Sequence, residues 1–316
     1  MKAYIIKRIL SMIPVLFIVA IFVFMLIHLI PGNPAAVILG PEATPEQVAA
    51  LEDELGLNMP IYQQFFDWLM GVLRGDLGDS VYMNVPVLDA FFDHLMPTLS
   101  LAIIAQFFSM IIAIPIGIIA ARKRGTYVDN SLMTVAMLGM SIPSFLLALL
   151  LMLLFGVKLG WLPVAGYSPL ENGVWEFIRH LILPAIALGA IQAAVIARMT
   201  RSSMIDILSL NYIKTAKAKG VTNNVVIYKH ALRNALIPIL TILGDTFGAL
   251  ITGAVVTETV FNLPGLGQLI LNAITRRDYA VIQGTILLVA FSYLILNLII
   301  DLLYGVINPK VRLSKK

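Results

Sequence analysis

Long apolar runs separated by shorter polar stretches are the dominant pattern along the chain. Six of these runs have about the 20 residues that an α-helix needs to cross the roughly 30 Å hydrocarbon core of a bilayer. The bilayer core offers the backbone no hydrogen-bonding partner, so such segments fold as helices. The pattern predicts an all-α integral membrane protein with six transmembrane helices, at residues 9–30, 98–121, 132–155, 181–199, 235–256 and 281–307.

The composition supports a membrane protein. Of the 316 residues, 59% are hydrophobic and only 13% are charged, which does not describe a water-exposed surface. No repeat or linker divides the sequence, so we expect one membrane domain over residues 1–316. The first apolar run is longer than the roughly 7–15 residues of a signal-peptide core, so it is expected to be a retained anchor. Because the chain has no cysteine, disulfides, zinc thiolates and iron–sulfur clusters are excluded.

Basic residues are distributed unevenly over the segments between these runs. Of the 22 Lys and Arg residues, 17 lie in the N-terminus, at 122–124, at 198–233 and in the C-terminal tail. Residues 31–97, in contrast, include ten acidic residues and the single basic residue Arg74. Short loops rich in Lys and Arg stay in the cytoplasm. We therefore expect both termini and the loop 200–234 inside the cell, and residues 31–97 outside.

The external segment has two helical signals of its own. The sequence Thr-Pro-Glu-Gln at 44–47 has the form of a capping box with proline in the first turn. Aromatic and apolar residues between Tyr62 and Val72 then recur at helical spacing until Gly75. This second helix is typical of aromatic anchoring at the headgroups. The alternative is the docking of an external partner.

The cytoplasmic loop 200–234 has helical signals on both sides of Gly220. Before this glycine, Tyr212, Ile213 and Ala216 share one helical face, and three lysines lie off that face. After it, Thr222 is a candidate helix cap. The sequence therefore predicts a short helix–glycine–helix hairpin. The alternative is a basic surface helix held against lipid headgroups.

Motifs of enzymes and metal sites are absent from the sequence. A phosphate-binding loop of the form G-x-x-x-x-G-K-[ST] needs a Gly-Lys pair, and the chain has none. The four histidines are scattered, and neither a metalloprotease motif nor a nucleophile elbow occurs. We expect no catalytic residues, no metal and no cofactor bound by this chain.

Polar residues within the predicted spans are candidates for a translocation path, because ionisable groups there normally face protein or water. Asp245 is the clearest, and its alternative role is packing within the small-xxx-small motif 244–248. The sequence Ser-Ile-Pro-Ser at 141–144 combines hydroxyls with a proline kink. The candidate path residues are Ser141, Pro143, Ser144, Asp245 and Glu258.

Several stretches of the sequence resemble a known family. The stretch Asn211–Gly220, with residues 229–238 behind it, looks like the coupling loop of ABC importer permeases that depend on a binding protein. The resemblance is closest to the first-permease (B-type) subunit of the dipeptide, oligopeptide, glutathione and nickel group. Further matching stretches lie at 30–34, 54–60, 75–80, 198–203, 257–267, 276–279 and 301–309.

The chain departs from the broad importer pattern at the coupling loop. That pattern reads Glu-Ala-Ala, three residues, Gly, nine residues, Ile-x-Leu-Pro. Aligned on Gly220, this chain has Lys214 in place of the glutamate and Arg233 in place of the proline. The departure is similar to that of the peptide group, and it puts in doubt any ATPase contact that needs the glutamate.

The resemblance implies a type I ABC importer permease fold in a bacterial or archaeal cytoplasmic membrane. It also implies a second homologous permease, two cytoplasmic ATPases that bind ATP and Mg²⁺, and an extracytoplasmic binding protein. The hairpin would sit in a cleft on an ATPase, with its apolar face filling the cleft and its lysines at the rim. The residues implied in this coupling are Tyr212, Ile213, Lys214, Thr215, Ala216, Lys217, Lys219, Gly220, Val221 and Val225.

The cargo is left open between short peptides, which we favour, and glutathione or a nickel chelate. An alternative of a different class is a proton- or sodium-coupled secondary transporter that uses Asp245, Glu258 and Asp301. Such transporters often have inverted repeats, and none is detected here. A channel or scaffold subunit without energy coupling is a further alternative.

Overall fold

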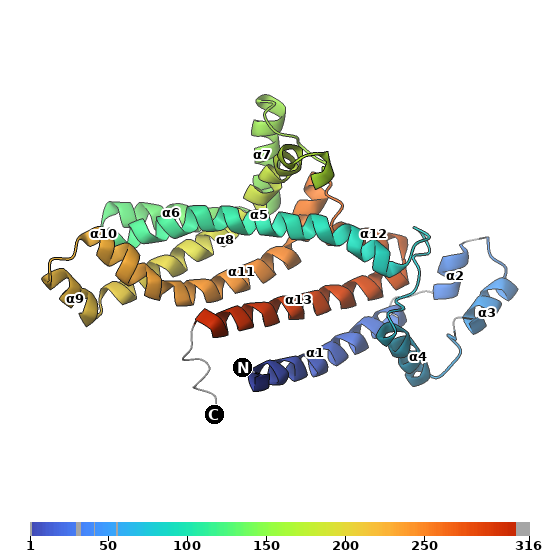
Figure 1. The fold of residues 1–316 in the computed structure, drawn as a ribbon. Helices are drawn as coiled ribbons and strands as arrows, with labels where there is room; N and C mark the ends of the chain where they lie inside the picture. Colours follow the sequence, from blue (N-terminus) through green and yellow to red (C-terminus); the bar gives the residue numbers. More distant parts are fainter. Residues whose placement is uncertain (1, 30–32, 41, 55, 308–316) are drawn as a thin grey trace. The chain divides into compact units, whose positions relative to one another are not determined.

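A computed structural model describes residues 2–29, 33–40, 42–54 and 56–307 of the chain. These residues form helices joined by loops, which confirms the predicted all-α class (Figure 1). They divide into two compact units, each described here by itself. The first contains residues up to Met96 together with Gln268–Leu298, and the second contains Pro97–Gly267 together with residues from Ile299 onward.

The first unit begins with the apolar helix α1 (Lys2–Leu29), which is followed by the short helices α2 (Pro34–Leu39), α3 (Pro45–Glu54) and α4 (Ile61–Leu73). The predicted capping box of α3 is present. Thr44 N–H donates to Gln47 Oε1 at 2.9 Å, and Gln47 N–H donates to Thr44 Oγ1 at 3.3 Å. These reciprocal bonds satisfy two backbone donors at the helix start.

The aromatic face of α4 packs on α1. The Phe65 ring meets the Phe24 ring edge-on with centroids 5.3 Å apart, and the Trp68 ring lies 5.7 Å from the Phe24 ring. Tyr62 and Phe66 are exposed. Part of the aromatic stripe is therefore used for internal packing, and the exposed part remains for the predicted headgroup or partner contacts.

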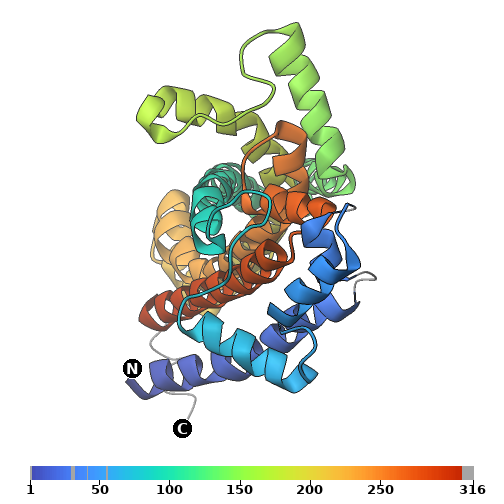
Figure 2. The ribbon, with the colours of Figure 1, turned by 90° about the vertical axis from the view of Figure 1, so that its right-hand side faces the viewer.

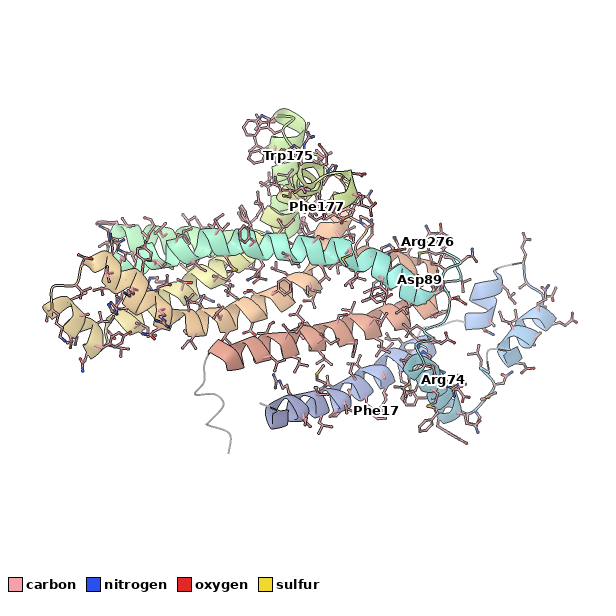
Figure 3. All side chains as sticks on the ribbon, viewed as in Figure 1. Phe17, Arg74, Asp89, Trp175, Phe177 and Arg276 are labelled. Atoms are coloured by element: carbon pink, nitrogen blue, oxygen red, sulfur yellow. The ribbon has the colours of Figure 1, made fainter. Side chains whose placement is uncertain are left out.

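The first unit also brings together two stretches that the resemblance singled out. Ser80 Oγ donates to the buried Asp278 Oδ2 at 2.6 Å, across 198 positions of sequence. The guanidinium of Arg276, which is labelled in Figure 3, lies 3.3 Å from the centre of the Tyr82 ring, a cation–π contact. The loop 75–86 is thus fixed to α12 (Leu266–Arg276) and to the start of α13 (Tyr279–Ile307).

The second unit is built around helices that pack closely through small residues. A Cβ added at Gly189 of α8 (Val174–Leu208) would lie 2.7 Å from Ser109 Oγ of α5 (Val87–Arg122). A Cβ at Gly117 would likewise lie 2.6 Å from Thr200 Cβ. In a bilayer no hydrophobic force drives helices together, so they associate through close van der Waals packing of this kind. The long helix α11 (Leu232–Phe261) packs along α8.

Five helical stretches are long and apolar enough to cross a membrane: Arg8–Leu29, Val87–Arg122, Val174–Leu208, Asn223–Phe261 and Tyr279–Ile300. The third predicted span, in contrast, is not one helix. It consists of α6 (Tyr127–Ser141) and of α7 (Ser144–Leu151) with the π-helix η1 (Met152–Lys158), which meet at 97° (Figure 1, Figure 2).

The break in this span has a local cause. Proline lacks a backbone N–H and disfavours helical geometry in the residue before it. Ile142, which precedes Pro143, is accordingly extended, with φ −82° and ψ 123°. The sequence predicted a kink at this proline, and the structure has a sharp break instead.

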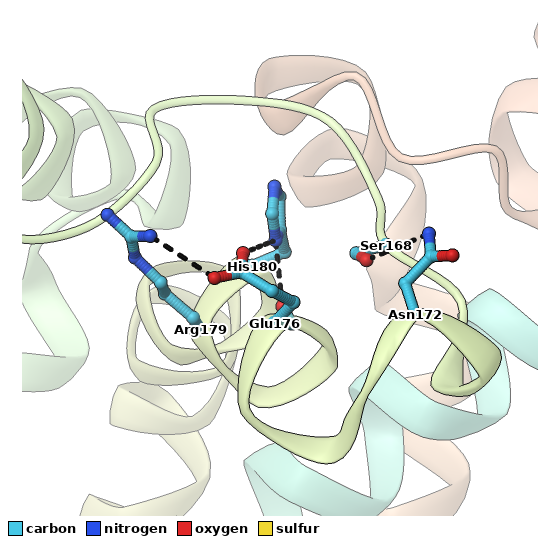
Figure 4. Close-up of polar contacts among 5 residues, drawn as sticks. All are labelled: Ser168, Asn172, Glu176, Arg179 and His180. Atoms are coloured by element: carbon cyan, nitrogen blue, oxygen red, sulfur yellow. Dashed lines mark hydrogen bonds and ion pairs between the residues drawn. The ribbon is translucent and has the colours of Figure 1, made fainter.

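A loop with local polar contacts leads from η1 into α8 (Figure 4). Asn172 Nδ2 donates to Ser168 Oγ at 3.4 Å, and Glu176 accepts from Arg179 Nη1 at 3.4 Å. The His180 ring lies 3.9 Å from the same Glu176 carboxylate. These side chains are partly exposed, and ion pairs of this kind contribute little to stability.

Candidate coupling and translocation sites

The predicted hairpin is present between α8 and α11. Its first arm is α9 (Asn211–Ala218), and its second arm consists of α10 (Asn223–Val225) and the π-helix η3 (Val226–Ala231), which continues into α11 (Figure 1). Both arms are therefore joined to the two long packed helices of the second unit. A displacement of the hairpin would act directly on α8 and α11.

Gly220 ends the first arm through a Schellman motif. Its N–H donates to Lys217 O at 3.0 Å, and the N–H of Val221 donates to Ala216 O at 3.2 Å. The motif needs a left-handed residue at this position, and Gly220 has φ +81°. Nothing lies within 4 Å of the position that its Cβ would occupy. The glycine is required by backbone conformation and not by crowding.

The apolar side of the hairpin is buried in its own unit. Ile213, Val226 and Ile227 are at most 2% exposed and belong to one core cluster with Ile118 of α5 and Met204 of α8. Of the apolar face that was expected to fill a cleft on an ATPase, Ile213 is therefore buried in this chain's own core, whereas Tyr212 is exposed and Ala216 is half-buried. A hairpin with such short arms is not stable alone, and its apolar side chains are needed to hold it on the unit.

The other side of the hairpin is open. The Tyr212 hydroxyl accepts from Asn234 Nδ2 at 2.8 Å and donates to His230 O at 3.3 Å, which ties the two arms together. Ala216 and Val221 are half-buried. The remaining residues implied in coupling are exposed: Lys214, Thr215, Lys217, Lys219, Gly220 and Val225.

Asp245 lies on the exposed side of α11. Its carboxylate makes no hydrogen bond or ion pair with any of the residues that the structure describes. The hydroxyl residues Thr241, Thr252 and Thr259 are also exposed on this helix and continue a polar stripe at helical spacing. The stripe is unusual for a helix of this apolarity, because polar groups rarely face lipid.

The small-xxx-small motif around Asp245 has a packing role that does not involve the carboxylate. A Cβ at Gly244 would lie 2.6 Å from Ile300 Cγ2, so this glycine allows close approach of α13. Thr246 and Gln106 are buried and hydrogen-bonded to each other at 3.3 Å. The packing contacts of this motif are thus made by Gly244 and Thr246, the neighbours of Asp245.

Glu258, in contrast, is fully buried and hydrogen-bonded. Its Oε1 accepts from Thr98 Oγ1 at 2.6 Å, and its Oε2 accepts from Gly267 N–H at 2.8 Å. Thr98 Oγ1 in turn accepts from Leu266 N–H at 2.8 Å. A Cβ at Gly265 would lie 2.2 Å from Glu258 Oε1. The carboxylate therefore joins an interior position of α5 and the last turn of α11 to the first turn of α12.

Two of the candidate path residues, Asp245 and Glu258, are not brought together. Asp245 and Glu258 are on the same helix, about 20 Å apart at the rise of an α-helix. Ser141, Pro143 and Ser144 lie at the break between α6 and α7, where Ser141 Oγ donates to Met137 O at 3.1 Å. The side chain of Asp301 lies outside the part of the chain that the structure describes.

One ion pair with a buried carboxylate was not anticipated from the sequence. Arg201 of α8 donates from Nε and Nη2 to the two carboxylate oxygens of Asp129 on α6, at 2.6 and 2.7 Å. The pair spans 72 positions of sequence. The available signal was Asp129, just before the third apolar run, because an acidic residue is expensive to bury unless it has a partner.

These features define a helical membrane protein with several spans and with a polar hairpin between two of its packed helices. Among the described residues, no group of three or more His, Asp or Glu side chains is arranged to hold a metal ion.

Two family models together cover nearly the whole chain. The model described as "Binding-protein-dependent transport system inner membrane component" matches residues 113–313. The model described as "Binding-prot-dependent transport system membrane comp, N-term" matches residues 1–114. The chain therefore belongs to the family of binding-protein-dependent transport system membrane components.

Relatives define the group within this family. The probable peptide ABC transporter permease protein y4tP of Sinorhizobium fredii is 44% identical over 99% of this chain and 100% of its own length. The glutathione transport system permease protein GsiC of Escherichia coli K12 is 45% identical over 99% of each chain. This confirms the ABC importer permease of the peptide and glutathione group and leaves no support for a secondary transporter.

The fold has a solved counterpart. An inward-facing MetNI methionine ABC transporter structure matches with a TM-score of 0.59 at 18% identity, over 69% of this chain and 96% of that chain. This likeness confirms the fold class. The chain is the membrane-spanning component and not the ATPase subunit of such a system.

Proposed function

We propose that this chain carries short peptides across the cytoplasmic membrane of a bacterium or archaeon as one permease of an ATP-driven importer. The observation that carries the proposal is the full-length similarity to a peptide permease and, equally, to a glutathione permease. Glutathione is itself a short peptide with free α-ammonium and carboxylate groups. A nickel chelate is the remaining cargo alternative, and no relative described here supports it.

The proposed partners are a second homologous permease, two ATPase subunits and an extracytoplasmic binding protein. ATP and Mg²⁺ would bind to the ATPases, because this sequence has no phosphate-binding loop of its own. Both termini and the hairpin would lie in the cytoplasm. The basic residues concentrated in these segments support that orientation.

Coupling is proposed to occur through the exposed side of the hairpin. Lys214, Lys217 and Lys219 form a positive surface that would meet an ATPase, and the buried Ile213 and Val226 would pass the movement to α8 and α11. A rigid-body displacement of this kind is a common way to link two sites. The half-buried Ala216 and Val221 would keep the turn fixed during the displacement.

The cargo path is proposed to follow the polar stripe of α11. Asp245 and the threonines of the stripe would face water and cargo, since an unpaired carboxylate facing lipid would be costly. Ser141, Pro143 and Ser144 stay as a second candidate lining at the break between α6 and α7. Glu258 has hydrogen-bond partners that account for it without a path, so it is the weakest candidate.

The cargo is tested by uptake into proteoliposomes that contain the complete importer and internal ATP. Labelled dipeptide should enter only when ATP and the binding protein are both present. Unlabelled dipeptide, glutathione and nickel chelate are then compared as competitors. Uptake without the ATPases would overturn the proposal. If the nickel chelate were the only effective competitor, the cargo would be a nickel chelate and not a short peptide.

The coupling role is tested at Gly220. Gly220→Glu places a bulky acidic side chain on the lysine-rich surface. A glutamate in the left-handed backbone conformation of this position also costs about 1–2 kcal/mol. Gly220→Asn is the matched control, because asparagine tolerates this backbone conformation. We expect Gly220→Glu to insert normally and to uncouple ATP hydrolysis from uptake, while the control stays near wild type. Unchanged uptake in Gly220→Glu would count against the coupling role.

A further inference from the structure

The ion pair between Asp129 and Arg201 sets a buried carboxylate of the second unit against a partly exposed guanidinium. The side chain of Asp129 is 1% exposed, and both of its oxygens accept from the guanidinium of Arg201, at 2.6 and 2.7 Å. The N–H of Gly125 donates a third hydrogen bond to Asp129 Oδ2 at 3.0 Å. All three interactions hold one carboxylate at a fixed place.

The pair lies where three elements of the second unit meet. Asp129 is in the first turn of α6, and Gly125 is in the turn that joins α5 to α6. Arg201 is on α8, seven positions before this helix ends at Leu208 and leads into the hairpin. One turn of α8 is also pressed against α5, where Thr200 leaves no space for a Cβ at Gly117.

Stability alone does not explain this contact. Removing the Asp129 carboxylate from water costs several kcal/mol, and the partly exposed Arg201 gives back only part of that cost. Apolar residues of similar size often replace such a pair without loss of stability. A bidentate arginine–carboxylate pair supplies something that apolar side chains do not. It fixes both the distance and the relative rotation of the two helices, whereas apolar surfaces can slide.

We propose that Asp129 and Arg201 are positioning residues for energy coupling. The inference rests on the proposed function, in which the ATPases displace the hairpin. Because α8 leads directly into the hairpin, the displacement reaches Arg201 first. The ion pair then forces α6 and the α5–α6 turn to follow α8, so that the broken third span moves as part of one body.

The test uses the complete importer in proteoliposomes, with uptake and ATP hydrolysis measured in the same sample. The double variant Asp129→Leu with Arg201→Met replaces the ion pair by apolar contacts. We expect the complex to assemble and to hydrolyse ATP as the wild type does. Uptake per ATP hydrolysed should fall about fivefold or more, the lower end of ordinary coupling between sites. Unchanged uptake per ATP would overturn the inference.

A second experiment keeps the inference testable where the apolar variant fails to assemble. The chain has no cysteine, so Asp129→Cys with Arg201→Cys introduces one defined thiol pair. A short bifunctional methanethiosulfonate linker added to the assembled complex should restore uptake per ATP, and a reductant should abolish it again. Each single cysteine variant, treated in the same way, is the control and should show no restoration.

The two experiments separate this inference from the proposed function. If the chain is not an ATP-driven permease, the wild-type complex itself shows no ATP-dependent uptake. If only the inference fails, the wild type transports, and the linked cysteine pair transports no better than the unlinked one. A loss of assembly in the cysteine pair before any linker is added would make the ion pair a folding determinant, which also overturns the inference.

Discussion

The two acidic residues of α11 are a natural comparison within one helix. Glu258 is fully buried at the end of the helix, and its carboxylate is held by Thr98 Oγ1 and by Gly267 N–H. Asp245 is exposed in the middle of the same helix and has no partner among the described residues. The sequence presents both as carboxylates in an apolar environment, yet their surroundings are opposite.

The difference teaches that the hydrogen-bond partners of a carboxylate, and not its depth in the membrane, indicate whether it has a structural or a functional role. A buried acidic group is expensive unless hydrogen bonds satisfy it. Glu258 meets that condition through a turn that contains Gly265 and Gly267. Asp245 has no such partner among the described residues, which is consistent with the proposed contact with water or cargo. The following changes test this contrast, in order of expected effect on stability.

The largest effect is expected for Gly265→Ala. The new methyl group would lie 2.2 Å from Glu258 Oε1 and would force the carboxylate away from its donors. Overpacking and lost hydrogen bonds together should cost about 3–5 kcal/mol of unfolding free energy. Thermal unfolding of the purified complex in detergent measures the change. Gly253→Ala is the matched control, since nothing lies within 4 Å of that position.

A smaller effect is expected for Glu258→Gln. The amide keeps the size of the side chain but turns one acceptor into a donor, which then faces Thr98 Oγ1 or Gly267 N–H. An unsatisfied buried group of this kind should cost about 2 kcal/mol. The same unfolding assay applies. A variant as stable as the wild type would show that the carboxylate does not hold the turn, and the comparison with Asp245 would fail.

Thr98→Val removes the hydroxyl that links Glu258 to the backbone of Leu266. The loss leaves the Leu266 N–H without its acceptor, and we expect a destabilisation of about 1–2 kcal/mol. Thr252→Val is the matched control on the exposed stripe. Its hydroxyl bonds only within α11, to Gly248 O at 3.2 Å and Ala249 O at 3.3 Å. Equal unfolding temperatures for the two variants would contradict the contrast.

Much of the fold was predictable from local sequence. The apolar runs gave the helical membrane class, and the glycine signal at 220 predicted the hairpin that the structure contains. The capping box at 44–47 was likewise visible, because its two partners are three positions apart. These features depend on neighbours in sequence, so pattern and propensity were enough to find them.

The features that were missed depend on contacts between distant segments. Thr98 and Glu258 are 160 positions apart, and Asp129 and Arg201 are 72 apart. No local pattern reveals such a pairing. The burial of Ile213 of α9 likewise depends on distant segments, because it packs in a core cluster with residues of α5 and α8. Periodicity identified Ile213 as part of an apolar face, but it could not tell whether that face meets a partner or the chain's own core.

The smallest effect on stability is expected for Asp245→Asn. The amide has the size of the carboxylate, and the residue is exposed with no partner among the residues that the structure describes. The unfolding free energy should therefore change by less than about 0.5 kcal/mol, as for ordinary surface substitutions. ATP-driven uptake by the same variant should fall, because the proposed path loses its charge while assembly with the ATPases is retained. If Asp245→Asn instead destabilises the complex as much as Glu258→Gln does, with uptake falling only in proportion, then Asp245 is held by a neighbouring subunit as a structural joint. The two acidic residues of α11 would then have one role at two interfaces, and the path would have to be sought at the break between α6 and α7.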